Sequence, residues 1–182
     1  MIPSERGRGR QMHAGALAAR GDVLWFLHAD TVMRCAGAAQ IASAFEDPRV
    51  VAGNFRLHFD GPSRGARFLN ALYPRLALLG LRYGDSGLFV HRTAYTRAGG
   101  FRPLPIFEDL DLLRRVRRLG RMVTLPGPLC TSSRRFESRA FAPVFARWVG
   151  MQVLYWTGCN PMRLGRWYYP PPSVTRRSQA PR

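Results

Sequence analysis

The feature that most constrains the fold is a short apolar run near the start of the chain. Val23–Leu27 reads Val-Leu-Trp-Phe-Leu, with no polar residue inside it. A continuous apolar run of this length is typical of a strand buried on both faces, as in the middle of a parallel sheet. Polar residues follow at once, because His28-Ala29-Asp30-Thr31 ends the run. The chain must therefore supply further strands and helices that cover both faces.

Strand-like and helix-like segments alternate along the chain, which predicts an α/β fold. Further strands are predicted over Val50–Asp60, Leu88–His91 and Met122–Leu125. Helices are predicted over Gln11–Arg20, Ala36–Phe45, Phe68–Leu81 (broken or kinked at Pro74), Glu108–Leu119 and Phe141–Trp156. With 46% apolar residues in 182, we expect a single domain over residues 1–170. The aromatic and proline-rich segment from Trp167 is expected to be irregular, with a disordered tail over residues 171–182.

Charge limits the classes of partner. The chain has 28 basic and 11 acidic side chains, a net charge of +17, and all of its basic residues are arginines. Such a balance suits nucleic acid, an anionic membrane surface or a substrate that carries phosphate, since the guanidinium group binds phosphate bidentately. Three cysteines without C-x-x-C spacing, no signal-like start and no apolar run of membrane-spanning length predict a cytoplasmic protein. Peripheral attachment to the inner face of the membrane remains open.

Two pairs of residues are candidates for chemistry. His28 and Asp30 lie two apart at the end of the predicted strand, so both side chains point to one side, where a carboxylate can meet a metal or a phosphate. The alternative is that Asp30 caps the next segment and His28 is structural. Glu108 and Asp109 begin an arginine-rich helix and could supply a general base. They could equally serve only the positive end of the helix.

Two further segments allow both functional and structural interpretations. Arg134-Arg135, after Thr131-Ser132-Ser133, could clamp a diphosphate or form a solvated basic loop. Gly84-Asp85-Ser86-Gly87 could place Asp85 at an acceptor hydroxyl or could be only a turn.

Five motifs in series resemble glycosyltransferase family 2, and most closely its small bacterial members described as radical-SAM- or selenodomain-associated transferases. The motifs are Gly9-Arg10-Gln11-Met12-His13-Ala14-Gly15-Ala16, Phe26-Leu27-His28-Ala29-Asp30-Thr31, Gly84-Asp85-Ser86-Gly87, Gly99-Gly100-Phe101 and Glu108-Asp109-Leu110-Asp111. The resemblance implies a GT-A-like, Rossmann-like domain with a mostly parallel sheet. It also implies a nucleotide-sugar donor, an unknown hydroxyl acceptor, a divalent metal (Mg²⁺ or Mn²⁺), inversion at the anomeric carbon and no specific nucleic-acid partner.

The resemblance also implies site residues. Asp109 corresponds to the catalytic base, with Glu108 beside it, and Asp30 to the last acid of the D-x-D motif, at the metal. The implied donor and diphosphate partners are Arg10, His28, Asp30, Arg134 and Arg135, and the implied acceptor residues are Asp85 and Ser86. His28 stands where the commoner D-x-D motif has its first acid.

The resemblance also predicts a missing part and leaves rivals open. Family members begin with a strand, a helix and a second strand that contacts the nucleotide base, and nothing similar precedes Gln11. We therefore predict that the domain is truncated at its N-terminus and that Met1 is not the functional start. The rival interpretations are a basic module that binds nucleic acid or an anionic membrane, and an inactive transferase remnant.

Overall fold

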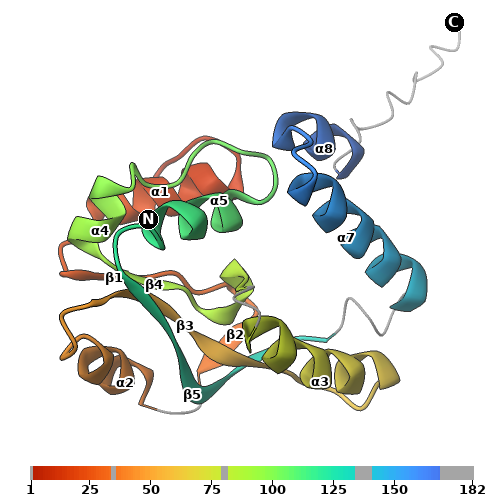
Figure 1. The fold of residues 1–182 in the computed structure, drawn as a ribbon, viewed down its shortest axis with the longest axis horizontal. Coiled ribbons are helices and arrows are strands. Elements are labelled where there is room, and N and C mark those ends of the chain that lie inside the picture. The colour runs from red at the N-terminus through yellow and green to blue at the C-terminus, as the bar shows by residue number, and fades with distance from the viewer. Residues whose placement is uncertain (1, 34–35, 79–81, 134–140, 169–182) are drawn as a thin grey trace, which may run out of the picture.

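The computed structural model describes residues 2–33, 36–78, 82–133 and 141–168. A single curled sheet runs through the described part, with helices on both faces (Figure 1). The predicted α/β class is therefore confirmed. The predicted extent of the domain, residues 1–170 with a tail over 171–182, stays a prediction because residues 169–182 lie outside the described part.

The sheet is mixed rather than mostly parallel. Its strands are β1 (Val23–Trp25), β2 (Thr31–Met33), β3 (Val50–Phe59), β4 (Phe89–His91) and β5 (Arg121–Thr131), in the order β1-β4-β3-β5-β2. Among these strands β3 and β5 pair in parallel, and the other three pairings are antiparallel. The expectation of a mostly parallel sheet is therefore wrong. β4 begins beside the end of β1, where the Phe26 amide donates to the Leu88 carbonyl at 2.7 Å, so these two strands run in opposite directions.

The strand β5 is much longer than the sequence predicts. The sequence predicts a strand over Met122–Leu125 only, and the prolines at 126 and 128, which cannot donate to a ladder, come directly after it. In the structure the register with β3 shifts between Phe55 and Arg56, so that Pro126 and Gly127 fall in the irregularity and pairing then resumes. Pro126 and Gly127 thus form a β-bulge and stay outside the ladder.

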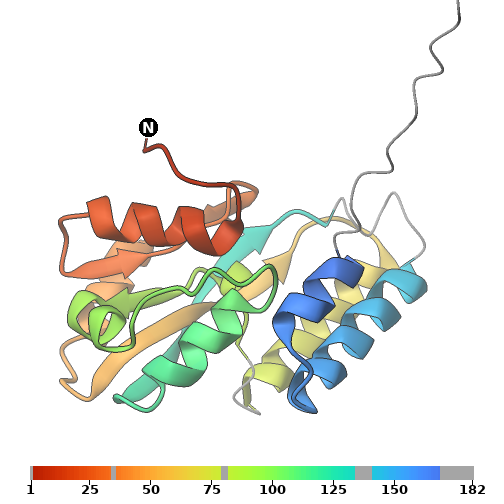
Figure 2. The same cartoon turned by 90° about the horizontal axis from the view of Figure 1, so that it is seen from above.

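Helices cover the two faces of the sheet separately (Figures 1 and 2). One face carries α1 (Arg8–Ala18), α4 (Arg92–Arg97) and α5 (Glu108–Val116), and the other carries α2 (Gly37–Ala44) and α3 (Arg64–Leu78). On the first face the buried core includes Leu24, Val90 and Leu112. On the second face it includes Phe55, Phe89 and Leu129. The helices predicted there are confirmed, whereas α4 was not predicted.

The helix α3 continues through Pro74 instead of breaking there. An interior proline costs a helix about 3 kcal/mol. Here tertiary contacts offset that cost, because Ala66 and Leu69 are buried against the sheet. The Asn70 side chain also bonds both backbone groups of Phe59, at 2.7 and 3.0 Å.

Two further helices lie at one end of the molecule, α7 (Phe141–Trp156) and α8 (Pro161–Tyr168) (Figure 2). The predicted bounds of α7 are confirmed. The segment from Trp167 was expected to be irregular, but α8 includes Trp167 and Tyr168. Ile106, Met151 and Leu164 form a small core that ties both helices to the segment leading into α5. No helix in the described ranges is long and apolar enough to cross a membrane.

Candidate active site

The first turn of α5 buries two carboxylates side by side. Glu108 and Asp109 expose 1% and 7% of their surface. The residue before them, Phe107, has a φ of 60°, a left-handed conformation that few non-glycine residues adopt. Its ring stacks on Tyr155, with 4.6 Å between the centroids. Packing of Phe107 thus fixes the direction in which α5 begins, and with it the position of both acids.

Arg8, at the start of α1, neutralises this pair. Its Nε donates to Glu108 Oε1 and its Nη2 to Asp109 Oδ2, the latter at 3.3 Å. Burial works to lower the pKa of the Arg8 guanidinium, but the charges of Asp109, Glu108 and Asp85 outweigh it and raise the pKa. One arginine therefore faces three carboxylates. We call Arg8, Asp85, Glu108 and Asp109 the acid centre.

The 3₁₀ turn η1 (Gly84–Ser86) brings the third carboxylate to the acid centre. The Gly84 amide donates to Asp109 Oδ2 at 2.7 Å. A Cβ on Gly84 would lie 2.8 Å from Asp109 Oδ2, so only glycine allows this approach. Asp85 follows directly. The loop that could have been a simple turn therefore bonds to the predicted catalytic residue.

Asp85 is an unusual carboxyl group. Burial, followed by the charge of Asp109, raises the pKa of Asp85 to about 6. The Tyr73 hydroxyl donates to Asp85 Oδ2 at 3.3 Å. The other oxygen, Oδ1, is buried without a hydrogen-bond partner among the described residues. A buried, unpaired carboxyl oxygen beside a second carboxylate indicates a functional site more strongly than a structural one.

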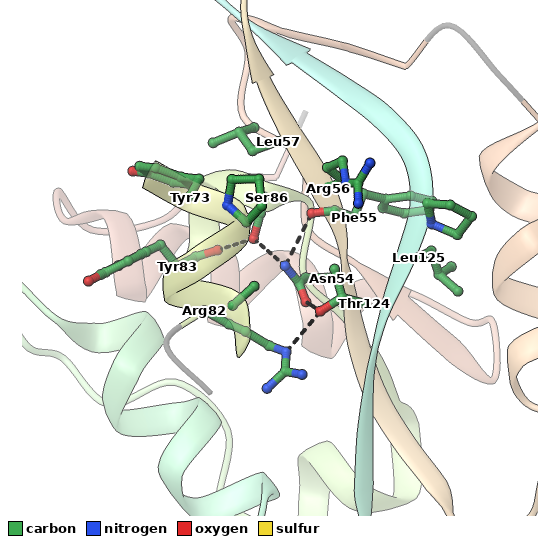
Figure 3. A pocket seen from close by; sticks show the side chains of 13 residues that line it. Asn54, Phe55, Arg56, Leu57, Tyr73, Arg82, Tyr83, Ser86, Thr124 and Leu125 are labelled. Carbon is green, nitrogen blue, oxygen red and sulfur yellow. Dashed lines mark hydrogen bonds between the residues drawn. The ribbon is translucent and has the colours of Figure 1, made fainter. Parts of the chain in front are cut away.

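Ser86 points away from the acid centre, into a polar network. Its hydroxyl donates to the Tyr83 carbonyl and accepts from Asn54 Nδ2 at 3.0 Å. Thr124 and Arg82 extend the network, as Figure 3 shows. It borders a cavity of about 300 Å³ lined by Asn54, Phe55, Arg56, Leu57, Tyr73, Pro74, Ala77, Arg82, Tyr83, Ser86, Thr124, Leu125 and Pro126. The geometry gives Ser86 a place in this network, and its acceptor role stays a prediction.

The segment after β1 places His28 near the acid centre. Burial and the charge of Arg8 lower the pKa of His28, while the charges of Asp30 and Asp109 act in the opposite direction. His28 thus lies within electrostatic range of both Asp30 and Asp109. The Thr31 amide bonds the His28 carbonyl at 3.2 Å and turns the chain, which leaves Asp30 exposed. The donor roles of His28 and Asp30 stay predictions.

The structure describes only one of the other predicted donor residues. Arg10 is exposed and pairs with Glu5. Arg134 and Arg135 lie outside the described residues.

Sequence reasoning missed Arg8 and Tyr73. Residues two apart on a helix point in nearly opposite directions, so only one of Arg8 and Arg10 could face α5. Two buried acids need a cation, but among 28 arginines the sequence does not single out Arg8. No pattern in the sequence pointed to Tyr73.

The residues present can be tested against the divalent metal that the resemblance implies. The described residues contain no group of three His, Cys, Asp or Glu side chains that could hold a metal ion. A protein cage is therefore absent from the described part. Asp30, with an exposed carboxylate, fits a different arrangement in which one carboxylate shares the ion with the phosphate oxygens of a ligand and with water.

The chain is similar to known proteins over part of its length. The crystal structure of mannosyl-3-phosphoglycerate synthase from Rubrobacter xylanophilus is similar to 85% of this chain and 53% of that one, with 20% identity and a TM-score of 0.43. The chain thus spans about half the length of that protein. None of the curated proteins matches it. The model of Glycosyl transferase family 2 matches residues 2–104, more than half of the 182 residues, and the chain belongs to that family.

Proposed function

We propose that the chain transfers a sugar from a nucleotide-sugar donor to an acceptor hydroxyl with inversion, and that Asp109 is the general base. The observation that carries this proposal is the acid centre, in which a buried carboxylate at a rigid helix start is held by Gly84 and Arg8. The family match includes His28, Asp30 and Asp85 but ends at residue 104, before Asp109. The role of Asp109 therefore depends on its surroundings in the structure.

Asp109 retains room to accept a proton. Its Oδ2 accepts from Gly84 and Arg8, whereas its Oδ1 accepts only from the Leu110 amide, at 2.8 Å, among the described residues. A carboxylate oxygen has two lone pairs, so Oδ1 can accept one more hydrogen bond. In an inverting transfer the acceptor oxygen attacks the anomeric carbon while its proton passes to the base. Asp109 Oδ1 is the atom to which we assign that proton.

Asp85 is suited to orient the acceptor. Its unpartnered Oδ1 can take a hydrogen bond from an acceptor hydroxyl, and its neighbour Tyr73 holds the other oxygen. Burial and the charge of Asp109 raise the pKa of Asp85 to about 6, so Asp85 takes up a proton more readily than an ordinary carboxylate does. The two carboxylates have different surroundings and different roles in this proposal: Asp85 binds the acceptor hydroxyl and Asp109 takes its proton.

Asp30 would hold the divalent cation together with the donor diphosphate, with His28 beside it. A bound Mg²⁺ or Mn²⁺ supplies charge that stabilises the leaving diphosphate. Arg134 and Arg135 come shortly after Thr131 in the sequence, and Thr131, the last residue of β5, pairs with Thr31, which directly follows Asp30. We keep these two arginines and Arg10 as proposed diphosphate partners.

The test is a screen of nucleotide sugars with Mn²⁺. A donor is expected to raise the melting temperature by mass action and, with an acceptor mixture, to release its nucleoside diphosphate. Proton NMR of the product is expected to show the anomeric configuration opposite to that of the donor. Retention of configuration, or a failure of every donor both to bind and to react, would contradict the proposal.

A matched pair of substitutions tests the base. Asp109→Asn is expected to lower turnover at least about a hundredfold, the usual size of a lost general base. The control is Asp111→Asn, in the same helical turn, whose carboxylate pairs with Arg115 at 2.7 Å and Arg102 at 3.4 Å. The control is expected to retain its turnover. If Asp109→Asn melts normally and retains full transfer activity, Asp109 is structural.

A further inference from the structure

The outer face of α7 is apolar although it faces solvent. The large hydrophobic side chains that are exposed in the described part are concentrated here, since six of eleven lie on α7 and α8. They are Val149, Val153, Leu154, Trp156, Met162 and Trp167. A concentration of this kind marks an interaction surface rather than scattered surface hydrophobics.

The exposed residues of α7 follow helical spacing. Ala142, Ala146, Val149, Val153 and Trp156 are all exposed and are separated by steps of four and three, so they lie along one stripe, which we call the α7 stripe. The opposite side of the helix packs inward, where Met151 is buried and Tyr155 stacks on Phe107. The contacts of α7 with the domain thus use the opposite side of the helix and leave the α7 stripe exposed to solvent.

Charge around the stripe has a single sign. The segments of α3, α7 and α8 contain no Asp or Glu at all, and each of their arginines is exposed. These arginines are Arg64, Arg67, Arg75, Arg147, Arg163 and Arg166. A cationic border around an apolar stripe complements a surface that is anionic outside and apolar inside.

The three helices adjoin one another. Phe68 of α3, 47% exposed, contacts the rings of Phe141 and Phe145 of α7 at centroid distances of 5.7 and 5.4 Å. Arg147 of α7 donates to the carbonyls of Trp167 and Tyr168 in α8. Figure 1 shows α7 at the outer edge of the molecule, beside α3 and α8.

We propose that the α7 stripe docks on an anionic lipid bilayer, with α7 lying in the plane of the interface. A helix of 16 residues is about 24 Å long, enough for in-plane binding and too short to span the bilayer. Val149, Val153 and Trp156 enter the apolar side of the interface, and the arginines of α3 and α8 contact the lipid phosphates. Tryptophan suits this depth because its ring is apolar and its N–H is polar.

Vesicle binding tests the proposal. The full chain is expected to sediment with vesicles that contain phosphatidylglycerol and to remain in solution with phosphatidylcholine alone. The double substitution Val149→Asp and Val153→Asp is expected to weaken binding by about tenfold or more, because it places carboxylates in the interface. The matched control is Leu17→Asp, at a position of α1 that is 71% exposed, and it is expected to bind like the wild type.

A second pair of variants tests the charged border independently of the stripe. Arg64→Gln with Arg67→Gln is expected to weaken binding and to reduce its dependence on salt. Arg117→Gln with Arg118→Gln, after the end of α5, removes the same charge elsewhere and is expected to change much less.

Three results would overturn the proposal. The first is wild-type protein that ignores anionic vesicles, and the second is unchanged binding by the stripe variant. The third is a wild-type dimer that the stripe variant dissociates without any vesicle binding, which would assign the stripe to a second copy of the chain. None of these results depends on whether the chain transfers sugar.

Discussion

The acid centre and the segment around Asp30 are built very differently. Asp109 is buried and accepts hydrogen bonds from two backbone amides and from Arg8. Asp30 is exposed, in a turn fixed by one backbone bond between Thr31 and His28. The catalytic side is thus organised before any ligand arrives, whereas the donor side leaves its carboxylate open to a ligand. Substitutions in the acid centre should therefore lower stability, whereas substitution of Asp30 should lower ligand binding and leave stability unchanged.

The largest expected effect comes from Gly84→Ala. The new Cβ would lie within 2.9 Å of Asp109 atoms, so the acid centre must shift. We expect unfolding free energy to fall by about 3 kcal/mol and turnover to fall at least about a hundredfold. Gly21→Ala, just before β1, is the control, since its Cβ would come no closer than 3.6 Å to a neighbour. Urea unfolding measures the stability of the two variants, and a donor assay measures their turnover. Equal stability and equal turnover for Gly84→Ala and Gly21→Ala would contradict the expectation.

The pH dependence of stability tests Asp85. Its pKa in the folded protein is about 6, above the ordinary 3.8, because burial and Asp109 disfavour the ionised form. The stabilising contribution of the neutral carboxyl is therefore complete below pH 4 and is lost as pH rises through 6. Relative to Asp85→Asn, the wild type should lose about 3 kcal/mol across this window. Parallel pH profiles for the two proteins would show that Asp85 is not buried with a raised pKa.

A smaller loss of stability is expected from Arg8→Gln. The substitution leaves the buried Glu108 without its cation. Removing one partner of a fully buried pair costs about 3–5 kcal/mol, and because Arg8 is itself half exposed we expect about 2 kcal/mol. Arg10→Gln, two residues on, removes only the exposed contact with Glu5 and should melt like the wild type. If both variants melt alike, Arg8 does not neutralise the acid centre.

The smallest effect on stability is expected from Asp30→Ala. Its carboxylate is exposed, so the melting temperature should not change. Calorimetric titration with a nucleoside diphosphate is expected to show Mn²⁺-dependent binding in the wild type and none in the variant. Equal affinities would refute the assignment of Asp30 to the metal and diphosphate.

The sequence predicted local structure where a single segment carries its own signal. Val50–Asp60 was predicted as a strand and forms β3, and Phe141–Trp156 was predicted as a helix and forms α7 with the same bounds. The α7 pattern could not reveal which side stays exposed. That depends on Phe107, which is distant in sequence, and on Leu164 of the next helix, because both pack on the inner side of α7.

Predictions failed where neighbours outweigh local preference. Pro74 predicts a break or a kink, and α3 does not break there, because burial of Leu69 and the bonds of Asn70 to β3 stabilise it. The predicted strand Met122–Leu125 is too short, because pairing of β5 with the long β3 resumes beyond the irregularity. The sequence also did not predict that β4 runs antiparallel to β1 and β3, because the direction of a strand depends on the edge of the sheet at which it begins.

Local periodicity was enough to predict the α/β class and a helix that begins at Glu108, and the motifs were enough to carry the resemblance to the family. The contacts of Arg8, rather than Arg10, with the acids and of Gly84 with Asp109 join segments that are far apart in the chain, so no local pattern gives them. The same holds for Asp85, whose raised pKa depends on burial and on a carboxylate 24 residues further along the chain. Hydrogen bonds and electrostatic fields act through space, and the sequence alone does not give the distances on which they depend.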